Sequence, residues 1–177
     1  MKTIAAFSAL IASSMAQGYF GVLSSRSASP IHLLSLTANG GKFTLGGTPS
    51  SYCPPQVGET CDAYPGNQTI LAGGQGSLSL GVIVPGGQQV YVAPDGTLSY
   101  TSPHSTYKPE GSIVDGWNRT EGEYFGYITF ASGLIACQTT EGKPWQVYGA
   151  IPAVNTTGCL GFSALTVNET DAGAWEY

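Results

Sequence analysis

Apolar residues recur at every second position over much of this chain, and turns rich in glycine interrupt the alternation. A period of two is typical of β-strands that bury one face and expose the other. The clearest β-hairpin is predicted over residues 88–101, where two alternating segments flank the turn Pro94-Asp95-Gly96. Two further strand–turn–strand units are predicted, over residues 31–45 with a turn at 37–41 and over residues 124–138 with a turn at 131–133.

Single strands are predicted at residues 19–23, 77–84, 145–148 and 160–167. No amphipathic helix of ordinary length is visible, and the 25 Gly and 11 Pro residues oppose one, since each costs about 1 and 3 kcal/mol respectively in a helix interior. We therefore predict an all-β fold, a single antiparallel β-barrel of about ten short strands. Three glycine-turned hairpins spaced by about fifty residues also suggest a β-trefoil-like arrangement.

Two segments are predicted as long loops because they are rich in Gly, Pro and Ser. They cover residues 46–76 and 101–118. Long irregular loops on a rigid scaffold are where binding surfaces usually lie.

The first sixteen residues have the pattern of a cleavable signal peptide. Lys2 precedes an apolar stretch, and small residues occupy Ser14 and Ala16. The mature chain is expected to begin near Gln17, with residues 17–177 forming one domain. No second apolar stretch approaches the roughly 20 residues that a membrane helix needs. We expect a secreted protein, extracellular or in a cell wall, without membrane insertion.

Four Asn-x-Thr sequons support export and predict a glycoprotein. A glycan is bulky and polar, so each acceptor asparagine is expected on the surface. The acceptors are Asn67, Asn118, Asn155 and Asn168.

The four cysteines are expected to form two disulfide bonds, as is usual in an exported chain. Three connectivities exist. We prefer Cys53–Cys61 with Cys137–Cys159, because each pair is close in sequence and closes a segment rich in Gly and Pro. The chain-entropy model gives about 2.5 to 3.5 kcal/mol for each loop.

The formal charge of the whole chain is −5, and its few basic residues are scattered. Phosphate binding needs a basic stripe, so nucleic acid is not expected as a partner. Nothing in the composition indicates an oligomer, and we expect a monomer.

A search for catalytic groups finds little. His32 and His104 are the two histidines, and they share no metal-ligand spacing with other residues, so no metal or other cofactor is expected. Nucleophile-elbow, phosphate-loop and dinucleotide motifs are missing from the sequence. The acids Asp115, Glu121 and Glu123 near Trp117 could serve a glycoside hydrolase. A solvated turn leading into a strand explains them more simply, and we expect no enzyme.

Aromatic residues give a better argument for binding, because tyrosine and tryptophan offer flat apolar faces with a polar edge. Tyr52, Tyr64 and Tyr107 fall in the predicted loops, and Trp117 stands beside the acids. These four residues are the candidate glycan contacts, and a cell-wall polysaccharide is a candidate partner.

Several short motifs together resemble a known family. They are Phe20-Gly-Val, Arg26-Ser, Ile31-His32, Gly116-Trp117, Leu134-Ile-Ala-Cys137, Trp145-Gln-Val-Tyr-Gly-Ala150 and Gly158-Cys159-Leu-Gly-Phe162. In this order they resemble the secreted fungal cell-wall proteins of the PhiA type, which include phialide wall proteins, IgE-binding proteins and a related elicitor of the plant hypersensitive response.

This resemblance implies a small, glycosylated, disulfide-bearing β protein that is shed into the fungal wall or lodged in it, and it supplies no catalytic mechanism. Its members are linked to conidium development or are perceived by host receptors or antibodies. The resemblance supports the Cys137–Cys159 bridge. It supports Cys53–Cys61 less, because the family carries a cysteine near the C-terminus that this chain lacks. We expect a secreted, non-enzymatic elicitor or antigen; a carbohydrate-binding wall protein is the alternative, and a glycosidase ranks third.

Overall fold

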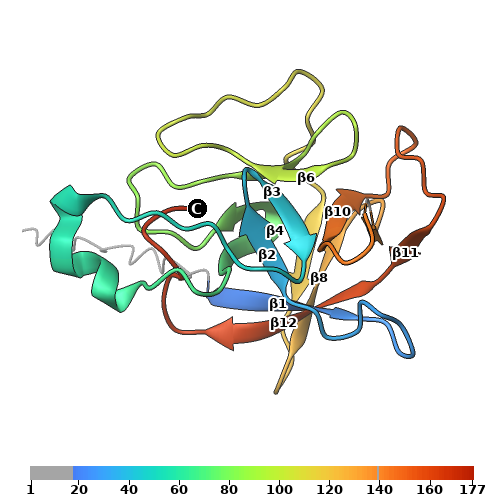
Figure 1. Ribbon diagram of the computed structural model, residues 1–177, viewed down its shortest axis with the longest axis horizontal. Coiled ribbons are helices and arrows are strands. Elements are labelled where there is room, and N and C mark those ends of the chain that lie inside the picture. The colour runs from blue at the N-terminus through green and yellow to red at the C-terminus, as the bar shows by residue number, and fades with distance from the viewer. Residues whose placement is uncertain (1–17, 139) are drawn as a thin grey trace, which may run out of the picture.

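The fold is almost entirely β-structure. The computed structural model describes residues 18–138 and 140–177, so the predicted signal peptide lies outside the described part of the chain. Twelve strands in this part form two antiparallel sheets (Figure 1). Within these residues, no helix is long and apolar enough to cross a bilayer. The predicted all-β, antiparallel class is thus confirmed.

Five strands close into a barrel. In their order around the barrel they are β1 (Tyr19–Ser25), β12 (Ser163–Glu169), β8 (Gly126–Phe130), β7 (Trp117–Thr120) and β4 (Leu71–Leu80). The longest pairing joins β1 to β12 over the whole of both strands, from Tyr19 opposite Glu169 to Ser25 opposite Ser163. A bridge between Phe20 and Leu71 joins β1 to β4 and completes the ring.

The remaining seven strands form the second sheet. Six follow the order β11 (Cys159–Gly161), β9 (Leu134–Cys137), β10 (Trp145–Gly149), β3 (Lys42–Leu45), β6 (Leu98–Tyr100) and β5 (Val90–Val92), and β2 (Leu36–Asn39) pairs with β3. Figure 1 shows β10 and β11 on one side of the molecule and the 3₁₀ segment η1 (Pro55–Ala63) at the far opposite side.

One hydrophobic core joins the two sheets. Alternate residues of the barrel strands, such as Phe20 and Ile128, are buried with residues of the second sheet, such as Phe43 and Val147. The alternation visible in the sequence therefore marks which face of each strand is buried.

Two of the three strand–turn–strand units form paired hairpins. Strands β5 and β6 pair as expected, with Val90 opposite Tyr100. Strands β2 and β3 also pair, but the turn is confined to Gly40 and Gly41, whose φ angles are 58° and 78°. A two-residue turn with both φ values positive suits the twist of a hairpin, and glycine adopts it without strain. Residues 37–39, predicted as turn, therefore belong to β2.

The third unit, residues 124–138, is not a hairpin. Strand β8 pairs with β7 and β12, whereas β9 pairs with β10 and β11. The turn at 131–133 carries the chain from the barrel into the second sheet. The single barrel of about ten strands is corrected accordingly: a five-stranded barrel and a separate sheet share the core, and neither strand order repeats a unit three times as a trefoil would.

The predicted loop 46–76 contains more structure than expected. It includes η1, which has no buried residue, and the first half of β4. Glycine-rich sequence concealed that strand, but the structure requires glycine there: Gly74 has φ of 97°, and a Cβ atom would lie 2.8 Å from the Cβ of Arg119. The other predicted loop ends where β7 begins, at Trp117.

Tyr177 is held in the core through Gln88, which is 1% exposed. The backbone N–H of Tyr177 donates to Gln88 Oε1 at 2.8 Å, and Gln88 Nε2 donates to the Tyr177 backbone oxygen at 2.8 Å and to the Thr101 carbonyl at 3.0 Å. The Tyr177 hydroxyl donates to the Gln68 carbonyl and accepts from the Ile70 N–H. This network ties residue 177 to the segments before β4 and β5.

Candidate functional site

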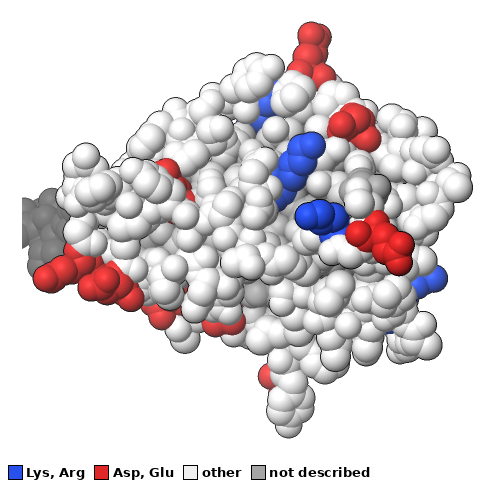
Figure 2. Space-filling view, viewed as in Figure 1, with Lys and Arg blue, Asp and Glu red and all other residues white. Residues whose placement is uncertain are grey.

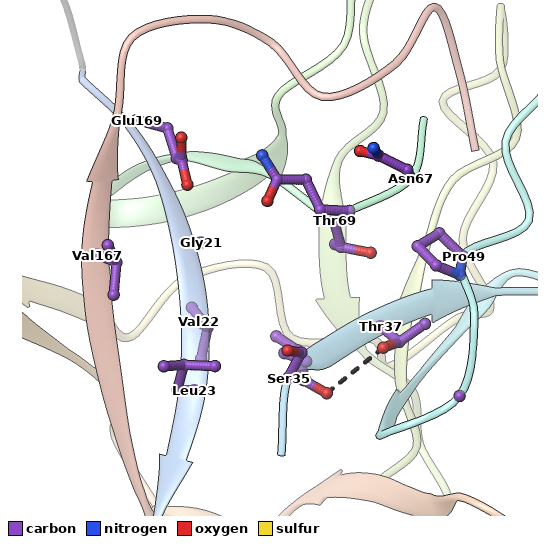
Figure 3. A pocket seen from close by; sticks show the side chains of 13 residues that line it. Gly21, Val22, Leu23, Ser35, Thr37, Pro49, Asn67, Thr69, Val167 and Glu169 are labelled. Atoms are coloured by element: carbon purple, nitrogen blue, oxygen red, sulfur yellow. Dashed lines mark hydrogen bonds between the residues drawn. The ribbon is translucent and has the colours of Figure 1, made fainter. Parts of the chain in front are cut away.

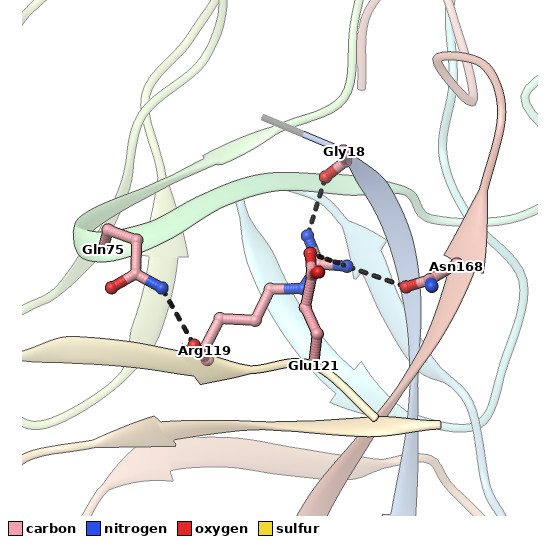
Figure 4. A network of polar contacts seen from close by, with 5 residues as sticks. All are labelled: Gly18, Gln75, Arg119, Glu121 and Asn168. Carbon is pink, nitrogen blue, oxygen red and sulfur yellow. Dashed lines mark hydrogen bonds and ion pairs between the residues drawn. The ribbon is translucent and has the colours of Figure 1, made fainter. Parts of the chain in front are cut away.

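The most conspicuous polar cluster surrounds Arg119 on β7 (Figure 4). Arg119 is 6% exposed. Its Nη1 donates to the Gly18 carbonyl at 2.9 Å, and its Nη2 donates to Asn168 Oδ1 at 2.8 Å. Its guanidinium carbon lies 4.1 Å from the centre of the Phe20 ring, a cation–π distance. Arg119 therefore links three barrel strands, β7, β1 and β12.

The three candidate acids lie at the surface of the protein. Asp115 and Glu123 are exposed. Glu121 is 71% exposed at its side chain and lies 3.6 Å from Arg119 Nη2. A glycosidase needs two carboxylates held about 5 to 9.5 Å apart around a bound sugar, and no cavity described for residues 18–138 and 140–177 is lined by any of these three acids. The simpler interpretation, a solvated turn, fits this exposure.

Trp117 is removed from the candidate glycan contacts by its burial. It is 3% exposed and packs on Phe130 with ring centres 4.9 Å apart. The alternation of β7 explains this, because Trp117 and Arg119 share the buried face of the strand. A sugar outside the barrel cannot reach the indole ring.

The aromatics that are exposed beside the acids are Tyr124 and Phe125. They are 81% and 50% exposed in the connection from β7 to β8, and Phe125 packs edge-on against Tyr127. The sequence signal was present, because these residues follow Glu121 and Glu123 directly. Tyr124 and Phe125 lie between the alternating segments of β7 and β8, where the alternation of apolar and polar residues is interrupted. Trp117, in contrast, follows the alternation of β7 and is buried.

The three loop tyrosines differ in exposure. Tyr107 is 77% exposed and Tyr52 is 55% exposed. Tyr64, at the end of η1, is half-buried. Tyr52 is also fixed to the fold, because its backbone N–H donates to the Glu176 carbonyl at 2.9 Å. Two of the three therefore offer open ring faces, but they lie on separate segments.

The histidines serve local structure or face solvent. His32 is exposed, and its Nδ1 accepts a hydrogen bond from the Arg26 N–H at 3.3 Å. His104 is exposed at a φ of 57°. Within the described part of the chain, no group of three or more His, Cys, Asp or Glu residues is placed to hold a metal ion.

The disulfide prediction is confirmed. Cys53 bonds to Cys61 across η1, and Cys137 bonds to Cys159 between the paired strands β9 and β11. The acceptor asparagines Asn67, Asn118, Asn155 and Asn168 are all exposed, as the sequons require. Their glycosylation itself stays a prediction.

A first cavity, the β1–β2 cleft, has a volume of about 300 Å³ (Figure 3). Val22 and Leu36 give it apolar walls, and Glu169 is the charged residue that lines it. Asn67, a glycan acceptor, lies at the same end of the cleft as Glu169 (Figure 3). A glycan on Asn67 would stand at the mouth of this cleft and restrict access to it.

A second cavity, the β3–β10 groove, has a volume of about 440 Å³ on the outer face of the second sheet. Gln146 on β10 stands opposite Thr44 on β3, and each strand contributes a further residue two positions along the same face, Lys42 and Tyr148. The groove is lined by Asn39, Lys42, Thr44, Gly47, Thr48, Pro144, Gln146 and Tyr148.

The charge on the surface is unevenly distributed. Figure 2 shows Lys and Arg side chains in the middle and at one side of the face in view, while Asp and Glu lie mainly near its edges. The basic side chains stand apart from one another and form no continuous stripe in this view.

Sequence alternation could identify the outward positions of β3 and β10 singly. It could not show that the two strands are neighbours, because about one hundred residues separate Thr44 from Gln146. The groove is for this reason a feature that sequence reasoning missed.

Comparisons with known proteins find a matching family model and a secreted relative. A family model described as PhiA-like secreted protein matches residues 20–177. An uncharacterized secreted protein of Arthroderma benhamiae is 36% identical over 156 residues, which cover 81% of this chain and 77% of that protein. No solved structure matches this chain.

Proposed function

This chain belongs to the PhiA-like secreted protein family, and from that premise we propose that it is a non-enzymatic glycoprotein of the fungal wall or its surroundings. In this proposal a host perceives its outer surface, as an elicitor of plant defence or as an antigen, and the protein takes part in conidium development. The protein is secreted, as its family is.

The observation that carries the proposal is the position of the charged side chains: the cation is buried and the acids are exposed. The buried cation Arg119 is bound to structural partners, and the acids nearest to it in the sequence are exposed to solvent. Two disulfides cross-link the scaffold, and four sequons with exposed asparagines lie on its surface. Such a scaffold can present glycans and loops. Such a surface acts by being recognised and needs no reaction of its own.

The test is infiltration of the purified protein into leaves, with a defence marker as the readout. Variants Asp115→Asn, Glu121→Gln and Glu123→Gln are expected to keep the full response and to release no sugar from wall polysaccharides. Loss of the response in a folded carboxylate variant, together with product release by the unchanged protein, would contradict the proposal. A deletion strain, scored for conidium yield, tests the developmental part separately.

A second candidate is attachment to wall polysaccharide through exposed tyrosines. The exposure of Tyr52 and Tyr107 favours it, since open tyrosine rings can stack on sugars. Co-sedimentation with insoluble glucan, chitin and mannan measures it, and Tyr52→Ala and Tyr107→Ala are expected to reduce retention. Equal retention of both variants would eliminate these residues as the attachment site.

A further inference from the structure

The β3–β10 groove has polar groups whose orientation is fixed by the fold. Gln146 Nε2 donates to the Phe43 carbonyl at 2.8 Å and to the Val147 carbonyl at 3.1 Å. Asn39 Nδ2 donates to the Thr48 carbonyl at 2.8 Å. These bonds hold both amides in place before any ligand arrives, which lowers the entropy cost of binding.

The same bonds determine which groups a ligand would meet. An amide has two N–H donors and one oxygen acceptor. Both donors of Gln146 are directed to backbone carbonyls, so its Oε1 is the atom left for a ligand. Asn39 directs one N–H to the fold and offers Oδ1 and its second N–H, and the exposed Lys42 ammonium offers donors. A ligand must therefore donate to the amides and accept from the lysine.

Beside these groups lies a half-buried aromatic ring. Tyr148 is on the same face of β10 as Gln146, and Pro144 continues the apolar surface. Burial raises the pKa of Tyr148, and the negative charge of Asp95 raises it further. The negative charge of Asp95 therefore acts at the Tyr148 hydroxyl, where it opposes the binding of an anionic ligand.

We propose that the β3–β10 groove binds a neutral sugar chain, with Tyr148 stacking on one sugar face and Asn39, Gln146 and Lys42 hydrogen-bonding its hydroxyls. A hydroxyl both donates and accepts, which satisfies two amide oxygens and an ammonium together. A sugar ring also has an apolar face for the tyrosine. The volume of about 440 Å³ lies within the range of small-ligand sites.

This site goes beyond the proposed function, because perception by a host requires no sugar groove. It is also separate from the candidate tyrosines, since none of Tyr52, Tyr64 and Tyr107 lines the groove. The β1–β2 cleft is the weaker site for the same ligand, because none of its lining residues is aromatic and one of them, Asn67, is a glycan acceptor.

The test is calorimetric titration of the secreted protein with β-glucan, chitin and mannan oligosaccharides, and with oligogalacturonate as the carboxylated probe. A neutral oligosaccharide is expected to bind, and Tyr148→Ala to weaken it by about tenfold or more. Tyr148→Phe should retain most of the affinity, and Lys42→Met should weaken it by a smaller factor. Tyr127→Ala is the matched control, an exposed strand tyrosine in the other sheet, and should bind as the unchanged protein does.

Backbone amide shifts in NMR spectra give a readout that requires no variant. Shifts clustered on residues 39–48 and 144–148 are expected. Shifts around Asn67 and Glu169, binding of none of the neutral probes, equal affinity in Tyr148→Ala, or salt-sensitive binding of oligogalacturonate alone would each overturn the inference. Failure here is distinct from failure of the proposed function, because Tyr148→Ala is expected to keep its leaf response.

Discussion

The Arg119 cluster and the β3–β10 groove both contain polar side chains on strands. They differ in whether the hydrogen-bonding groups of these side chains are all used within the protein. The Arg119 guanidinium contacts Gly18, Asn168 and the Phe20 ring, all within the barrel. In the groove, the amides of Gln146 and Asn39 direct only their N–H groups to the fold. Polar groups of the first kind stabilise the protein, and those of the second kind leave an acceptor that an outside ligand can use.

Removal of the Arg119 guanidinium should have the largest effect on stability. Arg119→Met keeps an apolar stem but leaves the Gly18 carbonyl and Asn168 Oδ1 without their donor. We expect a loss of about 3 kcal/mol in the free energy of unfolding, because the change deletes two hydrogen bonds from a buried charged group and each such bond contributes about 1.5 to 3 kcal/mol. Urea denaturation of the deglycosylated protein measures it.

Glu121→Gln is the matched control for Arg119→Met, because it removes the exposed partner of the same ion pair. An exposed pair of this kind contributes about 0 to 1 kcal/mol. If both variants unfolded at the same urea concentration as the unchanged protein, the Arg119 cluster would not be the structural centre described above.

Gln88 is a second buried side chain whose hydrogen bonds all end within the fold, and Gln88→Leu should cost slightly less. The change leaves the Tyr177 N–H and the Thr101 carbonyl without their partners. A loss of about 2 to 3 kcal/mol is expected. Gln89→Leu is the control: Gln89 is half-buried and its Oε1 accepts one part-buried hydrogen bond from the Lys108 ammonium. A smaller loss for Gln88→Leu than for Gln89→Leu would contradict this ranking.

The Tyr177 hydroxyl makes stability depend on alkaline pH. Burial raises the pKa of Tyr177 to about 12, although its hydrogen bond with Ile70 lowers the value in part. The unfolded chain releases this proton near pH 10, so the contribution is complete below pH 10 and is lost as pH rises towards 12. A decrease of about 2 kcal/mol is expected over this range.

Urea midpoints measured between pH 8 and 11.5 test this dependence. Tyr177→Phe should remove most of the slope while lowering stability at pH 8, because its hydroxyl also donates to the Gln68 carbonyl. An identical slope in Tyr177→Phe would assign the pH dependence to another group. Tyr100, whose pKa burial also raises, is the first candidate.

The alternation of apolar and polar residues predicted most strands, because each strand buries one of its faces, as β1, β5 and β10 do. It misplaced Trp117, which looked like a loop residue because glycines and prolines precede it, although Trp117 and Arg119 follow the period of a strand. The two disulfides followed from proximity in sequence. The sequence could not show that β8 and β9 belong to different sheets. A tight turn has the same residues whether the second strand pairs with the first or enters another sheet.

The candidate site shows the same limit more strongly. The strand residues of the β3–β10 groove occupy outward positions that alternation can find, but Lys42 and Tyr148 line the same groove only because β3 pairs with β10. Such long-range pairing is decided by packing of the whole core. A single sequence therefore identifies the side chains of the site but does not show which of them lie close together.

The smallest effects on stability are expected in the groove, and they would sharpen the contrast with Arg119. Lys42→Met removes an exposed charge whose loss should change the free energy of unfolding by less than about 0.5 kcal/mol. Tyr148→Phe keeps the ring and loses only the hydroxyl, so a similarly small change is expected.

Urea denaturation and the oligosaccharide titrations, carried out on the same samples, measure stability and affinity together. A groove variant that lost affinity in proportion to stability would be acting through the fold, and the distinction between the two kinds of polar side chain would then fail. Affinity lost at constant stability is the expected result, because the acceptors of Gln146 and Asn39 face a ligand and their donors already hold the sheet together.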